Sequence, residues 1–184
     1  TYSSKLSKAE LYKEHRRVGQ DLEIRGLTVT KPVLSYAIAH SVLFPLAGAQ
    51  WDKKSGTSVC VYPTHVDATI GYETIKVFVA SEFRKRSCQY KAVLAHEKEH
   101  VAAHRKALKK RTPRIKARLN GILKKFKPIR LSKGENPAEA IARKIDAGLK
   151  RYLTNLSNEA EDLNAEIDLP KNYRKIKKKC KKWP

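Results

Sequence analysis

Three histidines recur at every fourth position in the segment KAVLAHEKEHVAAH, residues 91–104. On a helix they would share one face, because four residues advance about one turn, or about 6 Å along the axis. The first two, His96 and His100, enclose Glu97 in the pattern HExxH. Two imidazoles at this spacing can coordinate one zinc ion, and the glutamate between them can act as general base toward a water molecule. The pattern therefore predicts a hydrolytic zinc site with His96 and His100 as ligands and Glu97 as the catalytic residue.

A helix must carry these side chains, and the sequence predicts one from Ser87, as the N-cap, to about Lys110. Pro113 is expected to end or interrupt it. The histidines and Glu97 fall on the same side of the helix as its apolar residues, and the other side is charged. Since an unpaired glutamate is costly to bury, this placement favours a metal site over a solvated helix that is merely rich in histidine.

The segments before this helix read mostly as strands. Residues 57–66 and 73–83 are expected to form an antiparallel hairpin around a turn at DATIGY. Residues 22–48 hold one or two strands, or a strand and a short helix, and residues 1–20 form a short helix or a loose arm.

The segments after it read mostly as helices. Residues 114–126 are basic and amphipathic, and SKGE is a loop. Asn136 and Pro137 then mark a strong helix start, followed by one long helix or two joined near Gly148. Pro170 is expected to stop this helix, and the basic tail 171–184 to be loosely held.

The expected fold is therefore α+β, with a small zincin-like sheet, antiparallel or mixed, packed on the HExxH helix, and a mostly helical C-terminal half. At 184 residues the chain is expected to form a single domain, with residues 1–20 as an arm and 171–184 as a tail.

The stretch YETIKVFVASEF…SCQYKAVLAHEKEHVAAH, within residues 72–104, resembles the active-site region of zincin metallopeptidases. The overall pattern is similar to small, poorly characterised bacterial zincins of the gluzincin kind. The resemblance implies a zinc peptidase acting on a peptide or protein, whose strand before the helix lines the cleft and holds the substrate by β-addition. It carries over His96, Glu97 and His100, and supplies no third ligand.

The third ligand has to come from elsewhere in the chain. The metzincin spacing, with a Gly and a later His, is absent, and a straight helix cannot easily aim His104 at the same ion as His96 and His100. Gluzincins take a glutamate from a later helix, but residues 105–134 contain no acid at all. The next acidic stretch is NEAEDLNAEID, whose carboxylates are Glu159, Glu161, Asp162, Glu166 and Asp168.

Among these we choose Glu159, which flanks the apolar stripe of its helix most closely and stands in NEAED, similar to the gluzincin NE…D motif with the Asp one residue early. Glu166, Glu161 and His104 remain alternatives, and Asp168 falls on the opposite flank. The candidates for stabilising an oxyanion are Tyr152, Tyr173 and His65.

The net charge of +22, from 40 basic and 18 acidic residues, favours anionic surroundings. Basic residues cluster in 105–133 and 171–182. Nucleic acid is not favoured as a partner, because no DNA- or RNA-binding signature is present and the aromatics are not interleaved with the basic runs. The alternative function is nevertheless a basic protein that binds nucleic acid or an anionic surface and has a structural or vestigial zinc site. No apolar run is long enough to span a bilayer.

Three cysteines allow at most one bridge within the chain, in three pairings. No CxxC pair is present, which excludes a cysteine zinc ribbon. We expect a secreted or periplasmic protein whose leader has been removed, and such a location permits a disulfide. We favour Cys88–Cys180, with Cys60 as a buried strand thiol.

Overall fold

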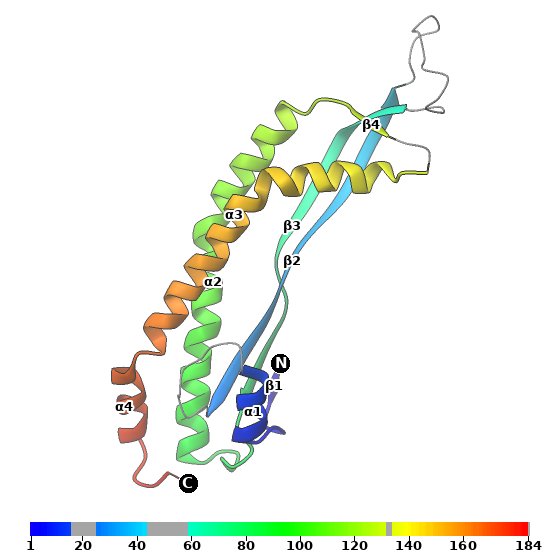
Figure 1. Ribbon diagram of the computed structural model, residues 1–184. Coiled ribbons are helices and arrows are strands. Elements are labelled where there is room, and N and C mark those ends of the chain that lie inside the picture. The colour runs from blue at the N-terminus through cyan, green and yellow to red at the C-terminus, as the bar shows by residue number, and fades with distance from the viewer. Residues whose placement is uncertain (16–24, 44–58, 132–133, 184) are drawn as a thin grey trace, which may run out of the picture. The chain divides into compact units, whose positions relative to one another are not determined.

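The computed structural model describes residues 1–15, 25–43, 59–131 and 134–183 (Figure 1). The fold is α+β with a small mixed sheet and a mostly helical second half. Along the chain the elements are β1 (Tyr2–Ser3), α1 (Lys8–His15), β2 (Gly26–Leu43), β3 (Val59–Val79), α2 (Cys88–Lys124), β4 (Ile129–Leu131), α3 (Pro137–Ile167) and α4 (Pro170–Lys178).

The sheet is ordered β1-β3-β2, and β4 also pairs with β3. β1 runs parallel to β3, with Tyr2 opposite Val77, whereas β4 is antiparallel, with Val59 opposite Leu131. Within the described residues β2 has β3 as its sole strand neighbour. It therefore lies at an edge of the sheet.

The expected hairpin is wrong, because β3 is one strand of 21 residues that runs straight through DATIGY. That segment has no Asn-Gly or Asp-Gly pair to set a tight hairpin turn, and it is surrounded by residues that favour strands. Gly71 has nothing within 4 Å of the position that a Cβ would take, so no close approach requires a glycine there. In the described part of 22–48 the chain forms the single strand β2.

Pro113 does not end α2, which continues to Lys124. A proline inside a helix removes one hydrogen bond and costs roughly 3 kcal/mol. Buried apolar side chains on both sides of it, including Ala107 and Ile115, offset that cost by packing one face of the helix.

Both predicted helix starts are confirmed. Ser87 Oγ accepts a hydrogen bond from the Tyr90 amide at 3.1 Å, and Asn136 Oδ1 accepts one from the Ala138 amide at 2.9 Å. α3 runs without a break through Gly148. Pro170 stands at the first position of α4, where a proline is well tolerated.

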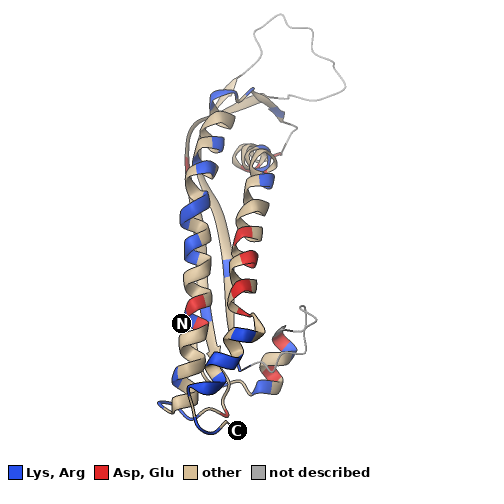
Figure 2. Cartoon of the chain, turned by 90° about the vertical axis from the view of Figure 1, so that its left-hand side faces the viewer, with Lys and Arg blue, Asp and Glu red and all other residues tan. Residues whose placement is uncertain are grey.

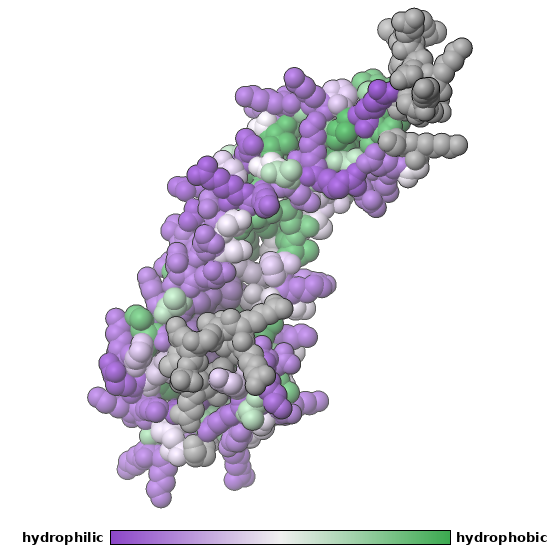
Figure 3. All heavy atoms as spheres, viewed as in Figure 1, coloured by the Kyte–Doolittle hydropathy of each residue, from purple (hydrophilic) through white to green (hydrophobic). Residues whose placement is uncertain are grey.

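The chain divides into two compact units. Unit 1 comprises Thr1–Val33, Gly71–Lys110 and Leu156–Pro184, and unit 2 comprises Leu34–Ile70 and Arg111–Asn155. The HExxH segment belongs to unit 1. On the face shown in Figure 3, most of the described surface of each unit is hydrophilic. Among the described residues, no helix has the length and hydrophobicity that crossing a bilayer requires.

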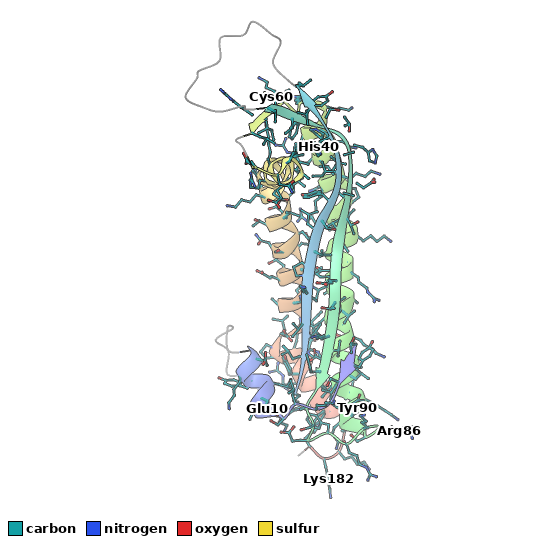
Figure 4. The ribbon with its side chains drawn as sticks, turned by 90° about the vertical axis from the view of Figure 1, so that its right-hand side faces the viewer. Glu10, His40, Cys60, Arg86, Tyr90 and Lys182 are labelled. Atoms are coloured by element: carbon teal, nitrogen blue, oxygen red, sulfur yellow. A yellow bond between two sulfur atoms is a disulfide. The ribbon has the colours of Figure 1, made fainter. Side chains whose placement is uncertain are left out.

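The disulfide Cys88–Cys180 is present, as predicted, and it joins the start of α2 to the residues after α4. The tail is therefore not loose. Its residues Ile176 and Cys180 are buried in a cluster with Ala92 of α2. Cys60 is a free thiol in β3, half-buried rather than buried (Figure 4).

Removing this bridge should cost about 2–5 kcal/mol of unfolding free energy, because it closes a long loop between cysteines that are 92 positions apart in sequence. The measurement is urea denaturation of Cys88→Ser/Cys180→Ser, with Cys60→Ser as the control. We expect Cys60→Ser to unfold at a urea concentration close to that of the wild type. A reducing agent should destabilise Cys60→Ser, which keeps the bridge, but not the double variant, which has no bridge to reduce. Equal stability of all three proteins would contradict the prediction.

Candidate metal centre

The HExxH residues lie on the inner face of α2, as the sequence predicts. His96, Glu97 and His100 are all buried, whereas Lys98 and Glu99 between them are exposed. Donor atoms of the three buried residues lie within 4.8 Å of one another, so this group could bind a metal ion.

A carboxylate from the end of α3 completes the arrangement. Asp168 Oδ1 lies 3.3 Å from His96 Nε2 and 3.2 Å from His100 Nε2, and the two Nε2 atoms are 3.3 Å apart. The three atoms thus form a nearly equilateral triangle. Asp168 is the residue immediately after α3, and its amide still donates to Asn164 O at 3.1 Å.

The triangle has the size that a tetrahedral zinc site requires. Zinc binds imidazole nitrogen and carboxylate oxygen at about 2.0–2.1 Å, so two ligand atoms of a tetrahedron stand roughly 3.3–3.4 Å apart. Each of the three distances is within about 0.2 Å of that spacing. Two imidazoles and one carboxylate are also a donor set typical of catalytic zinc. The residues present therefore fit the ion.

The structure does not bring Glu159 to the histidines. Its Oε1 accepts a hydrogen bond from Lys110 Nζ at 2.6 Å, and it is absent from the residues that line the cavity around the site. Of the alternatives, Glu161 lines the cavity and Glu166 does not. The apolar stripe of α3 did not identify the carboxylate next to the histidines, because Asp168 follows the last residue of the helix and helical periodicity no longer sets its direction.

Asn164, one turn before Asp168, is a site residue that was not predicted from the sequence. Its Oδ1 lies 2.8 Å from His100 Nδ1, and its Nδ2 lies 3.2 Å from His104 Nε2 and 2.8 Å from Ala160 O. Donation from His100 Nδ1 leaves its Nε2 directed toward Asp168 and fixes the ring, as partners of metal-binding histidines do. Asn164 and Asp168 are four residues apart, as His96 and His100 are, and this matching spacing could have indicated from the sequence that the two pairs face each other.

His104, one of the alternative third ligands, is not part of the triangle and supports Asn164 instead. Its Nε2 accepts from Asn164, and its ring packs edge-on against Tyr72 at 5.3 Å between centroids. Its buried Nδ1 has no hydrogen-bond partner among the described residues.

Glu97 is held by β2. Thr28 Oγ1 donates to Glu97 Oε2 at 2.8 Å, and a Cβ on Gly26 would come within 2.6 Å of Glu97 Oε1. Gly26 is therefore required for the close approach of β2 to α2. The strand that lines the site is β2, at residues 26–28, and not the strand that precedes α2, as the resemblance implied.

Burial and opposite charges shift the pKa values in this group. Burial raises the pKa of Glu97, and the attraction of His100 and the Thr28 hydrogen bond offset this only in part. For His100, burial lowers the pKa, but hydrogen bonding to Asp168 and the charge of Glu97 outweigh it and raise the pKa to about 9. Burial also raises the pKa of Asp168, yet hydrogen bonds from His100 and His96 hold it well below its usual range.

The site opens into a cavity of about 870 Å³ in unit 1. Tyr173 of α4 lines it, donates from its hydroxyl to Asp168 Oδ1 at 2.8 Å, and lies 5.2 Å from the His96 ring. The other sequence candidates for oxyanion stabilisation, Tyr152 and His65, belong to unit 2 and do not line this cavity. Figure 2 shows that most of the acidic residues of α3 lie in its C-terminal half, which includes the part that faces the site.

Asp168→Ala should lower the affinity for a divalent metal by at least about tenfold, because one of three ligands is lost. Glu159→Ala removes an equal charge from the same stretch and should change the affinity little. The measurement is titration with cobalt(II), whose absorption spectrum reports the ligand geometry. Equal effects of the two substitutions would contradict the assignment of Asp168.

Comparison with known proteins gives no relative for this chain: no family model, no curated protein and no solved structure matches it. The resemblance to zincins therefore rests on residues 72–104, and the function must be argued from the geometry of the site.

Proposed function

We propose that this protein is a zinc-dependent peptidase in which His96, His100 and Asp168 hold the metal and Glu97 is the general base. The observation that carries the proposal is the triangle of donor atoms, with sides of 3.2–3.3 Å, beside a buried carboxylate. On this proposal the sheet and α2 form a zincin-like core.

Zinc suits this donor set better than calcium or magnesium does. Calcium and magnesium prefer six or more oxygen ligands, whereas two imidazoles and one carboxylate suit zinc and leave a fourth position open. When bound, zinc lowers the pKa of a water molecule and polarises a carbonyl oxygen.

Glu97 is suited to the proton transfers of hydrolysis. Its carboxylate is buried, and its raised pKa makes it a stronger base than an exposed glutamate. Thr28 and Gly26 restrict its position from the side of β2. Glu97 takes a proton from the attacking water molecule and transfers it to the leaving amine as the peptide bond breaks.

Tyr173 is the candidate for stabilising negative charge on the carbonyl oxygen. Of the three candidates from the sequence, it alone lines the cavity of the site. Its hydroxyl donates to Asp168 here, so it is within reach of the metal ligands and can donate to a substrate oxygen after a small rotation.

A peptide is the favoured substrate because an edge strand borders the site. Residues 26–28 of β2 line the cavity, and β2 has a free edge within the described sheet. An extended peptide can add to such an edge through main-chain hydrogen bonds. The Cys88–Cys180 bridge supports a secreted or periplasmic location, where disulfides persist. A purely structural zinc site would leave the burial of Glu97 without a purpose.

Glu97→Gln should retain zinc and lose turnover by about 10²–10⁴-fold, because the amide cannot accept the proton. Glu99→Gln, two residues away and exposed, is the control and should cleave at the wild-type rate. The assay is a peptide-library digestion read by mass spectrometry, with zinc content measured on the same samples. Cleavage that survives Glu97→Gln would contradict its role as the base.

Tyr173→Phe should lower kcat by about 10²–10³-fold with little change in KM if the hydroxyl stabilises the oxyanion. Tyr152→Phe is the matched control, since that residue does not line the cavity of the candidate metal centre. Zinc affinity of both variants is measured alongside. A weakened affinity with unchanged kcat would show instead that Tyr173 only orients Asp168.

A further inference from the structure

Unit 2 contains a second cavity, of about 590 Å³, between α2 and α3. Four arginines line it: Arg111, Arg114 and Arg118 from α2, and Arg151 from α3. No carboxylate is among the described residues of its wall. The charged residues of this wall are all basic, whereas those around the candidate metal centre include carboxylates and histidines.

Helical spacing explains why the arginines converge. Positions 111, 114 and 118 are three and four residues apart, so they share one face of α2. Across from them, Gly148, Arg151 and Asn155 are likewise three and four apart on α3.

Close packing of the two helices forms the floor. A Cβ on Gly148 would lie 2.6 Å from the Cδ1 atom of Ile122, and Ile115 is buried at 4% exposure. Arg118 Nε donates to Gly148 O at 3.2 Å, which ties its guanidinium to the facing helix. Helix packing therefore fixes the backbone around the cavity, and the exposed side chains of Arg114, Arg118 and Arg151 line it.

Two of the four arginines of the wall, Arg114 and Arg151, carry charges that are not neutralised by an ion pair within the described part of the chain. The part of α2 that follows Lys110 carries no acid. Like charges brought together cost free energy unless an anion compensates them. Guanidinium groups bind phosphate and sulfate oxygens in pairs of parallel hydrogen bonds.

We propose that this cavity binds a small molecule that carries phosphate or sulfate groups, with Arg114, Arg118 and Arg151 as the anion-binding residues. Tyr152 and Asn155 add a hydroxyl and an amide for the rest of the ligand. A volume of about 590 Å³ suits such a ligand, since small-molecule sites usually span about 300–1,000 Å³. A nucleic-acid duplex would instead need a broad basic face. Figure 2 shows Lys and Arg spread along the C-terminal half of α2, so the test includes a duplex as the competing ligand.

The experiment is calorimetric titration of the full chain with pyrophosphate, inorganic phosphate, a sulfated disaccharide, anionic phosphatidylglycerol vesicles and a DNA duplex. The test variant is Arg114→Gln/Arg151→Gln, and the control is Lys116→Gln/Lys150→Gln. Both pairs are exposed, lie on the same two helices and remove two positive charges, but the lysines do not line the cavity.

We expect saturable one-to-one binding of pyrophosphate or the sulfated disaccharide, weakened by at least about tenfold in the arginine variant and by less than about threefold in the lysine variant. The same anion should raise the melting temperature of the wild type and of the lysine variant but not of the arginine variant, which tests binding without calorimetry. Loss by the same factor in both variants, or binding confined to vesicles or duplex, would overturn the proposal, as would the absence of saturable binding by any small anion. Since the metal centre is in unit 1, zinc content should stay the same throughout.

Discussion

The contact of Asp168 with His96 and His100 is the interaction on which unit 1 depends. Burying Glu97 together with two imidazoles is favourable only if charges are balanced and polar atoms are paired. Asp168 pairs with the Nε2 atoms of both imidazoles, and Asn164 pairs the outer nitrogen of His100. The end of α3 must therefore lie against the N-terminal half of α2, and the rest of the unit supports that approach.

Two other features support the same approach. Gly26 and Thr28 bring β2 against α2, so Glu97 is confined between a strand and a helix. On the opposite side, α4 places Tyr173 against Asp168 and His96, and the Cys88–Cys180 bridge ties the end of α4 to the start of α2. Arg25 lies over the Trp183 ring at 4.4 Å, so the last described residue also packs on the wall of the site. The tail is thus part of the structure around the candidate metal centre.

The two units divide the electrostatic character of the chain. The acids from Glu159 to Asp168 belong to unit 1, where Glu159 pairs with Lys110 and Asp168 with the histidines. The basic part of α2 that follows Lys110 belongs to unit 2 and includes the arginine cavity. The basic residues behind the net charge of +22 are therefore unevenly distributed along the chain, and four arginines among them line one cavity.

The sequence alone determined the features that depend on local chemistry. HExxH placed two histidines and a glutamate on one face of a helix, Ser87 and Asn136 were recognisable as N-caps, and the α+β class followed from the order of strand and helix patterns. Tertiary structure decided the rest. Pro113 and DATIGY carry local signals for a break, but packing along α2 and strand pairing along β3 outweighed them. The partner of the histidines could not be read from helical periodicity, because Asp168 lies beyond the last residue of α3 and its position depends on where that helix ends against α2. Long-range approach of this kind is set by the sum of many packing contacts, and no short stretch of sequence encodes it.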